Sequence, residues 1–372
     1  MRALKVAPEV FVFDTFKEFA DEFQIGKKDL VLTHEFLYEP FMKPLGIESN
    51  YIFQERFGVG EPSDEMIDAI TAEMSQYDFD RIVAFGGGTI IDIAKLFALK
   101  MPEKSINLFE GVAPIERVKK LVLVPTTCGT GSEVTNISIA ELKSKHTKKG
   151  LAVDELYADA AVLIPEALKG LPYKFFATSS IDALIHAIES FVAPKSNEYT
   201  ELFALKAIEM IVAGYKTIAE KGEETRYDLL KDFAIASNYA GIAFANTGVG
   251  AVHALSYSIG GAYHVPHGEA NYQFFTEIFK MYNKKNPDGK IKEANQVIAN
   301  VLGVNVGDDV YAALEDLLNQ IIAKKPLKEY GMTEAEIDSF TESTIANQQR
   351  LLANNYVELS KEEIREIFAS LY

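Results

Sequence analysis

The sequence has little of what marks secreted, nucleic-acid-binding or membrane-surface proteins. A single cysteine, Cys128, cannot form an internal disulfide bond, and no basic N-terminal segment precedes an apolar signal core. Lys and Arg number 37 against 54 Asp and Glu, and the formal charge of −17 opposes binding to nucleic acid or to an anionic membrane. We therefore expect a cytoplasmic protein that has no nucleic-acid or membrane partner.

The sequence also lacks a long apolar run without polar interruption. Residues 233–268 contain no Asp, Glu, Lys or Arg and are numerous enough to cross a bilayer. Asparagine, serine and histidine side chains interrupt them, however, and each unpaired polar group would be costly in lipid. We interpret this stretch as a buried, uncharged wall whose polar groups converge on a shared site.

What the sequence does contain is ample core material, with 48% hydrophobic residues. Short β-rich runs alternate with helical patterns in the first half, which predicts a parallel sheet covered by helices. From Ser179 onward, helical spacing dominates. The predicted fold is α/β plus all-α: a Rossmann-like nucleotide-binding domain over residues 1–172, followed by an all-helical domain that binds metal and substrate over residues 173–372.

A glycine turn follows one of the predicted strands, Arg81–Phe85, and opens the helix that contains Asp92 and Lys95. Backbone N–H groups and the dipole of a helix start can hold a pyrophosphate in such a turn, and glycine allows close approach. The residues concerned are Gly86, Gly87, Gly88 and Thr89. The pattern is not the GxGxxG fingerprint, so a simple tight turn is the alternative.

A second candidate loop, residues 125–133, follows the apolar strand Leu121–Val124. Four hydroxyl groups in this loop suit hydrogen bonds to phosphate and ribose: those of Thr126, Thr127, Thr130 and Ser132. The alternative is an exposed polar loop. Cys128 lies in the same loop without an identified base, so we do not expect it to act as a nucleophile.

Asp182 and His186 are spaced i, i+4 on a helical stretch, which puts both side chains on one face. Such a pair by itself is more often a surface or capping hydrogen bond than a metal site. His253 and His267 lie in the uncharged wall, where they can meet the carboxylate. One Asp and three neutral imidazoles suit a divalent metal with oxygen and nitrogen ligands, either Fe²⁺ or Zn²⁺.

The sequence resembles the iron-dependent (group III) alcohol dehydrogenases over nearly its full length. The motifs that carry the resemblance are GGGT with Asp92 and Lys95, PTTCGTGSEVT, DALIHAIES and AVHALSYSIGGAYHVPHGEAN. The resemblance implies that the first domain binds NAD, with NADP not excluded, and that the helical domain holds the metal through Asp182, His186, His253 and His267. It also implies a cofactor contact from Lys149 and a homo-oligomer, a dimer in this family.

Segments outside these motifs, among them LKVAPEVFVFDTFKEF and QQRLLANNY, resemble the family members that interconvert 4-hydroxybutyrate and succinate semialdehyde. A negatively charged protein repels that substrate's carboxylate unless a donor such as Asn246 or Lys174 compensates. The alternatives are a dehydrogenase of uncharged primary alcohols or diols, and a metal-dependent lyase or hydrolase whose loops hold a phosphorylated substrate. A catalytically silent nucleotide-binding protein is a third.

Two positions depart from the family pattern. Tyr257 stands where many members have a histidine, and His34 stands after the second strand, where many members that prefer NAD have an aspartate. The predicted catalytic proton relay is therefore His264, with Tyr257 second; the alternative for His264 is a structural hydrogen bond behind the metal.

Overall fold

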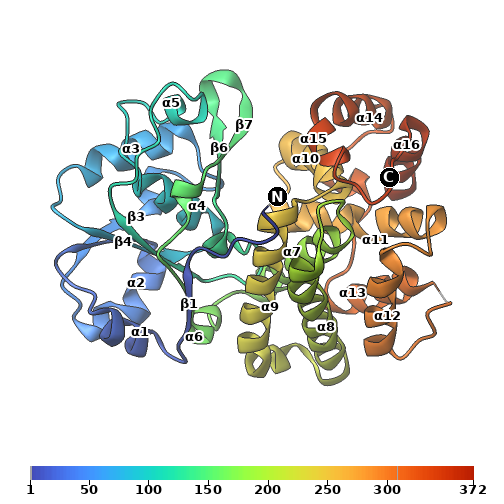
Figure 1. The fold of residues 1–372 in the computed structure, drawn as a ribbon, viewed down its shortest axis with the longest axis horizontal. Coiled ribbons are helices and arrows are strands. Elements are labelled where there is room, and N and C mark those ends of the chain that lie inside the picture. Colours follow the sequence, from blue (N-terminus) through green and yellow to red (C-terminus); the bar gives the residue numbers. More distant parts are fainter. Residues whose placement is uncertain (1, 308) are drawn as a thin grey trace. The chain divides into compact units, whose positions relative to one another are not determined.

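The computed structural model describes residues 2–307 and 309–372, which form two compact units (Figure 1). The α/β unit holds residues 6–127 and 132–171, and the helical unit holds the residues up to Lys5, residues 128–131 and residues 172 to the C-terminus. The N-terminal segment and the segment 128–131 thus differ from the predicted division, because both pack with helices rather than with the sheet.

Within the described residues, the α/β unit has a six-stranded parallel sheet in the order β1-β8-β5-β4-β2-β3. The strands are β1 (Glu9–Val12), β2 (Asp29–Thr33), β3 (Asn50–Phe53), β4 (Arg81–Gly86), β5 (Lys120–Pro125) and β8 (Ala160–Leu163). The helices are α1 (Phe16–Phe23), α2 (Glu35–Phe41), α3 (Asp64–Met74), α4 (Gly88–Phe97), α5 (Ile106–Phe109) and α6 (Pro165–Leu168). The predicted fold class is confirmed.

Two separate cores cover the two faces of this sheet. Along β4, Ile82 and Ala84 belong to the core that also contains α3 and α4, whereas Val83 and Phe85 belong to the core that contains α1 and α2. Successive side chains of a strand point to opposite faces, so a strand covered on both sides must be apolar at every position. This is why the central strands read as continuous apolar runs.

A small antiparallel hairpin of β6 (Ile137–Leu142) and β7 (Thr147–Ala152) was not predicted. Its second strand, TKKGLA, is exposed along nearly its whole length, so no alternation of apolar and polar residues marks it. The short strand β8 was missed as well. Its sequence, AAVL, contains two alanines, which are poor strand formers, and all four residues are buried, so neither composition nor alternation marks it as a strand.

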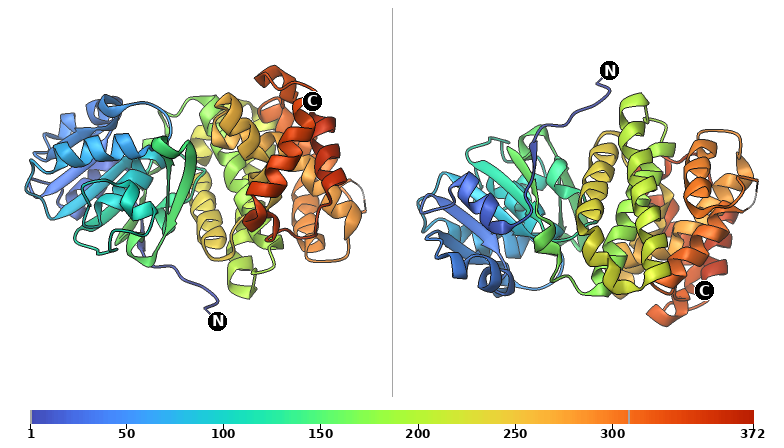
Figure 2. Two further views of the ribbon diagram at one scale, coloured as in Figure 1. Left: turned by 90° about the horizontal axis from the view of Figure 1, so that it is seen from above. Right: turned by 90° about the horizontal axis from the view of Figure 1, so that it is seen from below.

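Ten helices form the helical unit in the described residues: α7 (Tyr173–Val192), α8 (Glu198–Lys221), α9 (Arg226–Thr247), α10 (Ala251–Tyr263), α11 (His267–Lys285), α12 (Ile291–Leu302), α13 (Val310–Ile321), α14 (Glu336–Asn347), α15 (Gln349–Leu352) and α16 (Lys361–Leu371). The long helices α8 and α9 lie side by side and both pack on α7 (Figure 2). Helix α7 alone among the described helices is long and apolar enough to cross a membrane, but 89% of its apolar window is buried. It is a core helix of this unit.

Candidate functional site

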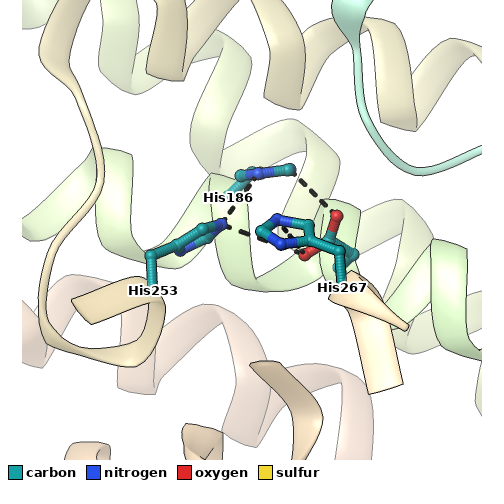
Figure 3. A group of neighbouring side chains, drawn as sticks. His186, His253 and His267 are labelled. Carbon is teal, nitrogen blue, oxygen red and sulfur yellow. Dashed lines mark hydrogen bonds and ion pairs between the residues drawn. The ribbon is translucent and has the colours of Figure 1, made fainter. Parts of the chain in front are cut away.

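The four predicted metal ligands come together in the helical unit. One ligand atom from each of Asp182, His186, His253 and His267 lies within 4.8 Å of the others. Figure 3 shows the three imidazole rings facing one another from separate parts of the backbone. Three of the four side chains are buried, while that of His267 is 40% exposed and forms the open side of the cluster.

Helix packing explains why residues distant in sequence meet here. Asp182 and His186 lie one turn apart on α7, whereas His253 comes from α10 and His267 is the first residue of α11. At the start of α11, a Cβ on Gly268 would lie 2.5 Å from the carbonyl oxygen of Thr178. Only glycine lets α11 approach α7 this closely, and that approach brings His267 beside Asp182.

Charge and burial prepare these side chains to bind a cation. Burial alone would raise the pKa of Asp182, but the three neighbouring histidines lower it, so the carboxylate is ionised. Burial lowers the pKa of His186 to about 4 against the pull of Asp182, so its imidazole is neutral. An anionic oxygen donor beside a neutral nitrogen donor is what a divalent ion requires.

His253 is oriented by a buried carboxylate that the sequence analysis did not identify. Glu189 lies 2.6 Å from Nδ1 of His253 and also accepts a hydrogen bond of 2.8 Å from the backbone N–H of Val252, at the start of α10. Burial alone would lower the pKa of His253, but Glu189 raises it. With Nδ1 bound to the carboxylate, Nε2 faces the cluster, 3.1 Å from Nε2 of His186.

Asp182 and His186 also have orienting partners. Asn271 donates to Oδ1 of Asp182 at 2.7 Å and accepts from the hydroxyl of Ser256 at 2.5 Å. Nδ1 of His186 donates to the carbonyl oxygen of Gly129 at 3.3 Å, within the segment 128–131 that belongs to the helical unit. These bonds leave the metal-facing atoms of the ligands little freedom to reorient.

The sequence carried a signal for some of these partners. Glu189 follows Asp182 by seven positions, and Asn271 follows His267 by four, so each shares a helix face with a ligand. No spacing rule could have identified the Gly129 carbonyl, because its contact with His186 spans 57 residues and belongs to the backbone.

The arrangement fits a bound divalent ion. Bonds of about 2.1 Å to one ion in tetrahedral geometry place neighbouring ligand atoms roughly 3.4 Å apart. The Nε2 atoms of His186 and His253 lie 3.1 Å apart, and Oδ1 of Asp182 lies 4.0 Å from Nε2 of His253 and 3.9 Å from Nε2 of His267. The set contains oxygen and nitrogen donors and no thiolate, which suits Fe²⁺ or Zn²⁺.

The two predicted relay residues lie in different surroundings. The ring of Tyr257 lies beside that of His267, with 6.4 Å between the centroids. His264 is exposed and caps the C-terminus of α10 in the left-handed conformation, with φ 54°. Tyr257 therefore has a ring contact with a candidate ligand, whereas His264 is exposed at the end of α10, and the order of the two relay candidates stays a prediction.

In the α/β unit, the glycine turn and the second loop lie next to each other. Gly86 pairs with Pro125 across β4 and β5, and the N–H of Thr126 donates to the carbonyl oxygen of Gly86 at 3.0 Å. Helix α4 starts at Gly88 without a side-chain cap, and a Cβ on Gly87 would meet nothing closer than Thr127 at 3.6 Å. An open helix start of this kind fits a pyrophosphate.

Asp92 and Ser132, both predicted to bind the cofactor, are joined through a buried lysine. Nζ of Lys95 donates to the hydroxyl of Ser132 at 2.6 Å and to that of Thr135 at 2.9 Å, and the Ser132 hydroxyl donates to Asp92 at 2.5 Å. Burial lowers the pKa of Lys95, although Asp92 opposes the shift. This network holds the second loop against α4, which gives Asp92 and Ser132 a positioning role.

Three other predicted cofactor residues occupy different places. The Thr89 hydroxyl donates to the carbonyl oxygen of Gly60 at 3.1 Å, and Thr130 lies in the segment of the helical unit that contacts His186. Lys149 is exposed on the hairpin, paired with Ala140. Beside Thr130, Cys128 is buried, which raises the pKa of its thiol to about 12, so it is not a nucleophile at neutral pH.

Asn246 and Lys174, the two donors predicted to compensate the charge of the substrate's carboxylate, already have partners. Asn246 exchanges hydrogen bonds with the backbone of Lys5, at 2.7 Å and 3.0 Å, and so holds the N-terminal segment. Nζ of Lys174 lies 2.6 Å from the carboxylate of the buried Glu269. Lys174 nevertheless remains half-exposed, whereas the amide of Asn246 is fully used.

The comparisons with known proteins agree with this geometry. Residues 8–165 match the family described as iron-containing alcohol dehydrogenase, and residues 176–372 match the Fe-containing alcohol dehydrogenase family, C-terminal. The chain belongs to the iron-containing alcohol dehydrogenase family. The two matches fall on the α/β unit and on the helical unit, so the family resemblance seen in the sequence motifs is confirmed.

Within the family, the chain is 56% identical to the 4-hydroxybutyrate dehydrogenase of Clostridium kluyveri over 372 residues, which is 100% of both chains. It is 31% identical to the long-chain-alcohol dehydrogenase 1 of Geobacillus thermodenitrificans, over 84% of this chain and 80% of that protein. The first likeness covers both units at almost twice the identity of the second.

Solved structures share the fold of this family member. A sulfoacetaldehyde reductase from Bifidobacterium kashiwanohense, in complex with NAD⁺, superposes with a TM-score of 0.86 at 21% identity and covers 99% of this chain and 98% of its own. A 1,3-propanediol oxidoreductase gives a TM-score of 0.83 at 23% identity, with 100% of both chains covered.

Proposed function

We propose that this protein is a metal-dependent dehydrogenase that interconverts 4-hydroxybutyrate and succinate semialdehyde, with NAD as the hydride carrier. The observation that carries the proposal is the complete cluster of Asp182, His186, His253 and His267 in a chain 56% identical, over its full length, to a 4-hydroxybutyrate dehydrogenase. The metal is Fe²⁺, in keeping with the family's description, with Zn²⁺ as the second choice.

The reaction moves a hydride from the alcohol carbon to nicotinamide and a proton from the hydroxyl group to solvent. A metal bound at the cluster supplies Lewis acidity that stabilises negative charge on the substrate oxygen. The chain's own part is to hold this site in place: Glu189 orients His253, and Asn271 orients Asp182. Tyr257, whose ring lies beside that of His267, is the proposed relay that passes the proton toward solvent while donating its own, and His264 is the alternative for the same role.

The α/β unit binds the dinucleotide in this proposal. The open start of α4 at Gly87 and Gly88 receives the pyrophosphate, and Thr126 and Thr127 face it from the adjacent loop. A solved structure with the same fold is in complex with NAD⁺, which supports a dinucleotide rather than a phosphorylated substrate. We further propose a homodimer, as the family resemblance implies, and a location in the cytoplasm, as expected for a chain with a single cysteine.

The test compares initial rates for 4-hydroxybutyrate, 1-butanol and 1,4-butanediol with the purified, metal-loaded enzyme. A charge-assisted hydrogen bond to the carboxylate contributes roughly 1.5–3 kcal/mol, so kcat/KM for the acid should exceed that for 1-butanol by at least about tenfold. The diol is the control, because it has the same chain length without the charge. Equal kcat/KM values for all three substrates would indicate a general alcohol dehydrogenase instead. Substrate turnover without NADH formation would indicate a lyase or hydrolase.

A further inference from the structure

The strand ends around the glycine turn bring a carboxylate to the edge of the sheet that carries the proposed dinucleotide site. Strand β2 pairs with β4, and β3 pairs with β2, all in parallel, so their C-terminal ends share one edge of the sheet with the glycine turn. The hydroxyl of Thr33, at the end of β2, donates to the carbonyl oxygen of Phe85 at 2.8 Å. Glu55 comes two residues after the end of β3, and its carboxylate contacts the residues that follow β2 at this edge.

The carboxylate of Glu55 is fixed at the end of β2 by two donors. One oxygen accepts from the backbone N–H of Glu35 at 2.7 Å, and the other lies 3.0 Å from Nδ1 of His34. Both donors would otherwise be available to a phosphate group. Glu55 occupies them with a negative charge of the protein's own.

This carboxylate is ionised and remains accessible. Burial alone would raise the pKa of Glu55, but the hydrogen bonds from backbone N–H groups and His34 lower it. Its side chain is 35% exposed, so it can still meet a ligand. The neighbouring Glu35 is exposed and adds a second negative charge at the start of α2.

The loop after β5 indicates in which direction a dinucleotide would lie along this edge of the sheet. That loop continues into residues 128–131, whose Gly129 carbonyl contacts the candidate metal ligand His186. Hydride transfer requires the nicotinamide to reach the alcohol carbon at the metal, so the nicotinamide end belongs with the β5 loop. The adenosine end then lies on the other side of β4, at the end of β2.

We propose that Glu55 is the residue that selects NAD over NADP, an inference that rests on the proposed dinucleotide site. Its carboxylate accepts a hydrogen bond from the 2′-hydroxyl of the adenosine ribose and repels the 2′-phosphate of NADP. In dinucleotide-binding sheets, an acidic residue at the end of the strand next to the glycine strand performs this task. Here His34 occupies that position, and the acidic group is supplied from β3.

The decisive measurement is the ratio of the dissociation constants of NADH and NADPH, obtained by fluorescence titration of the wild type and of Glu55→Gln. The variant keeps the side chain's size but removes its charge, so the ratio should shift toward NADPH by at least about tenfold, or about 1.4 kcal/mol. Melting temperature and bound metal should not change. A merely structural role of Glu55 would alter those two quantities and leave the ratio as it was.

Two further variants keep the test valid even if the Glu55→Gln protein does not fold. His34→Arg pairs with Glu55 and offers a cation to the 2′-phosphate, so it should shift the ratio in the same direction. Glu39→Gln is the matched control: it removes the same charge from α2, where Glu39 pairs with Lys43 at 2.7 Å, and should leave the ratio unchanged.

The outcomes separate this inference from the proposed function. A wild-type protein that binds NADPH as tightly as NADH, or two variants that keep the wild-type ratio, would overturn the role of Glu55 while leaving the dehydrogenase intact. A wild-type protein that binds neither dinucleotide would overturn the proposed function, and this inference with it.

Discussion

The candidate metal cluster of the helical unit and the glycine turn of the α/β unit are suited to ligand binding by different means. In the cluster, four side chains converge within 4.8 Å, and buried partners such as Glu189 and Asn271 hold them there. In the turn, the binding groups are backbone N–H groups at the start of α4, and Gly87 contributes open space. Removing a side chain should therefore destroy the first site, and adding one should block the second.

The largest effect is expected at the open side of the cluster. His267→Ala leaves three ligands and an enlarged opening, so bound metal should fall well below one ion per chain, and kcat by at least about a thousandfold, or about 4 kcal/mol of barrier. Elemental analysis and initial rates measure both quantities. The control is His146→Asn, in the exposed turn between β6 and β7, which should change neither the bound metal nor kcat. Full occupancy in His267→Ala would mean that the ligands are assigned wrongly.

The converse change in the turn is Gly87→Val. The backbone at Gly87, with φ −76°, accepts a branched residue, so the α/β unit should fold while the new side chain fills the space meant for pyrophosphate. We expect NADH affinity to fall by at least about a hundredfold, or about 2.7 kcal/mol, in a fluorescence titration.

Gly86 is unsuitable for that experiment, since a Cβ there would lie 2.5 Å from Ile90 and disturb the packing of α4. Bound metal in Gly87→Val should equal that of the wild type, because the cluster lies in the other unit. An unchanged NADH affinity would exclude the glycine turn from the cofactor site.

A smaller effect should follow from Glu189→Gln, which tests whether the partners of the ligands matter. The amide keeps the shape of the side chain but weakens the hydrogen bond that orients His253, so metal affinity should fall about ten- to a hundredfold. Competition with a chelator measures this. Glu209→Gln, which breaks an exposed pair with Lys206, should leave the affinity unchanged. If both variants behave alike, the cluster does not depend on Glu189.

The smallest effect concerns stability outside both sites. Glu315 is half-buried; burial alone would raise its pKa, but hydrogen bonds from Lys280, Lys324 and Thr276 lower it from 4.5 to about 2. A carboxylate with a depressed pKa stabilises the fold above its ordinary pKa, and that contribution is lost as the pH falls from 4.5 toward 2.

Glu315→Gln should therefore lower the free energy of unfolding at pH 7 by about 1–2 kcal/mol, a value reduced for solvent screening. Denaturant titrations at several pH values should show the difference from the wild type shrinking in acid. Glu342→Gln, which breaks an exposed pair with Lys361, should cost at most about 0.5 kcal/mol at any pH. A difference for Glu315→Gln that does not depend on pH would contradict this origin.

The sequence by itself determined the class of each unit and the four candidate metal ligands that the structure brings together. Alternating strands and helices, apolar strands such as Arg81–Gly86, and the i, i+4 pair of Asp182 and His186 are local patterns. Local patterns depend on periodicity, which is visible in a single chain. The histidines of α10 and α11 became candidates because they lie in the stretch 233–268, which has no Asp, Glu, Lys or Arg. The absence of charged residues can also be read from the sequence alone.

Only the tertiary structure decided which groups hold those residues in place. The Gly129 carbonyl on His186 and the carboxylate of Glu55 at the end of β2 come from segments that are remote in sequence or have no periodic pattern. The same holds for Lys95, whose Nζ donates a hydrogen bond to the hydroxyl of Ser132 within a buried network. Such contacts arise when helices and loops pack to bury apolar surface and every buried polar group must find a partner, a condition that no local pattern records.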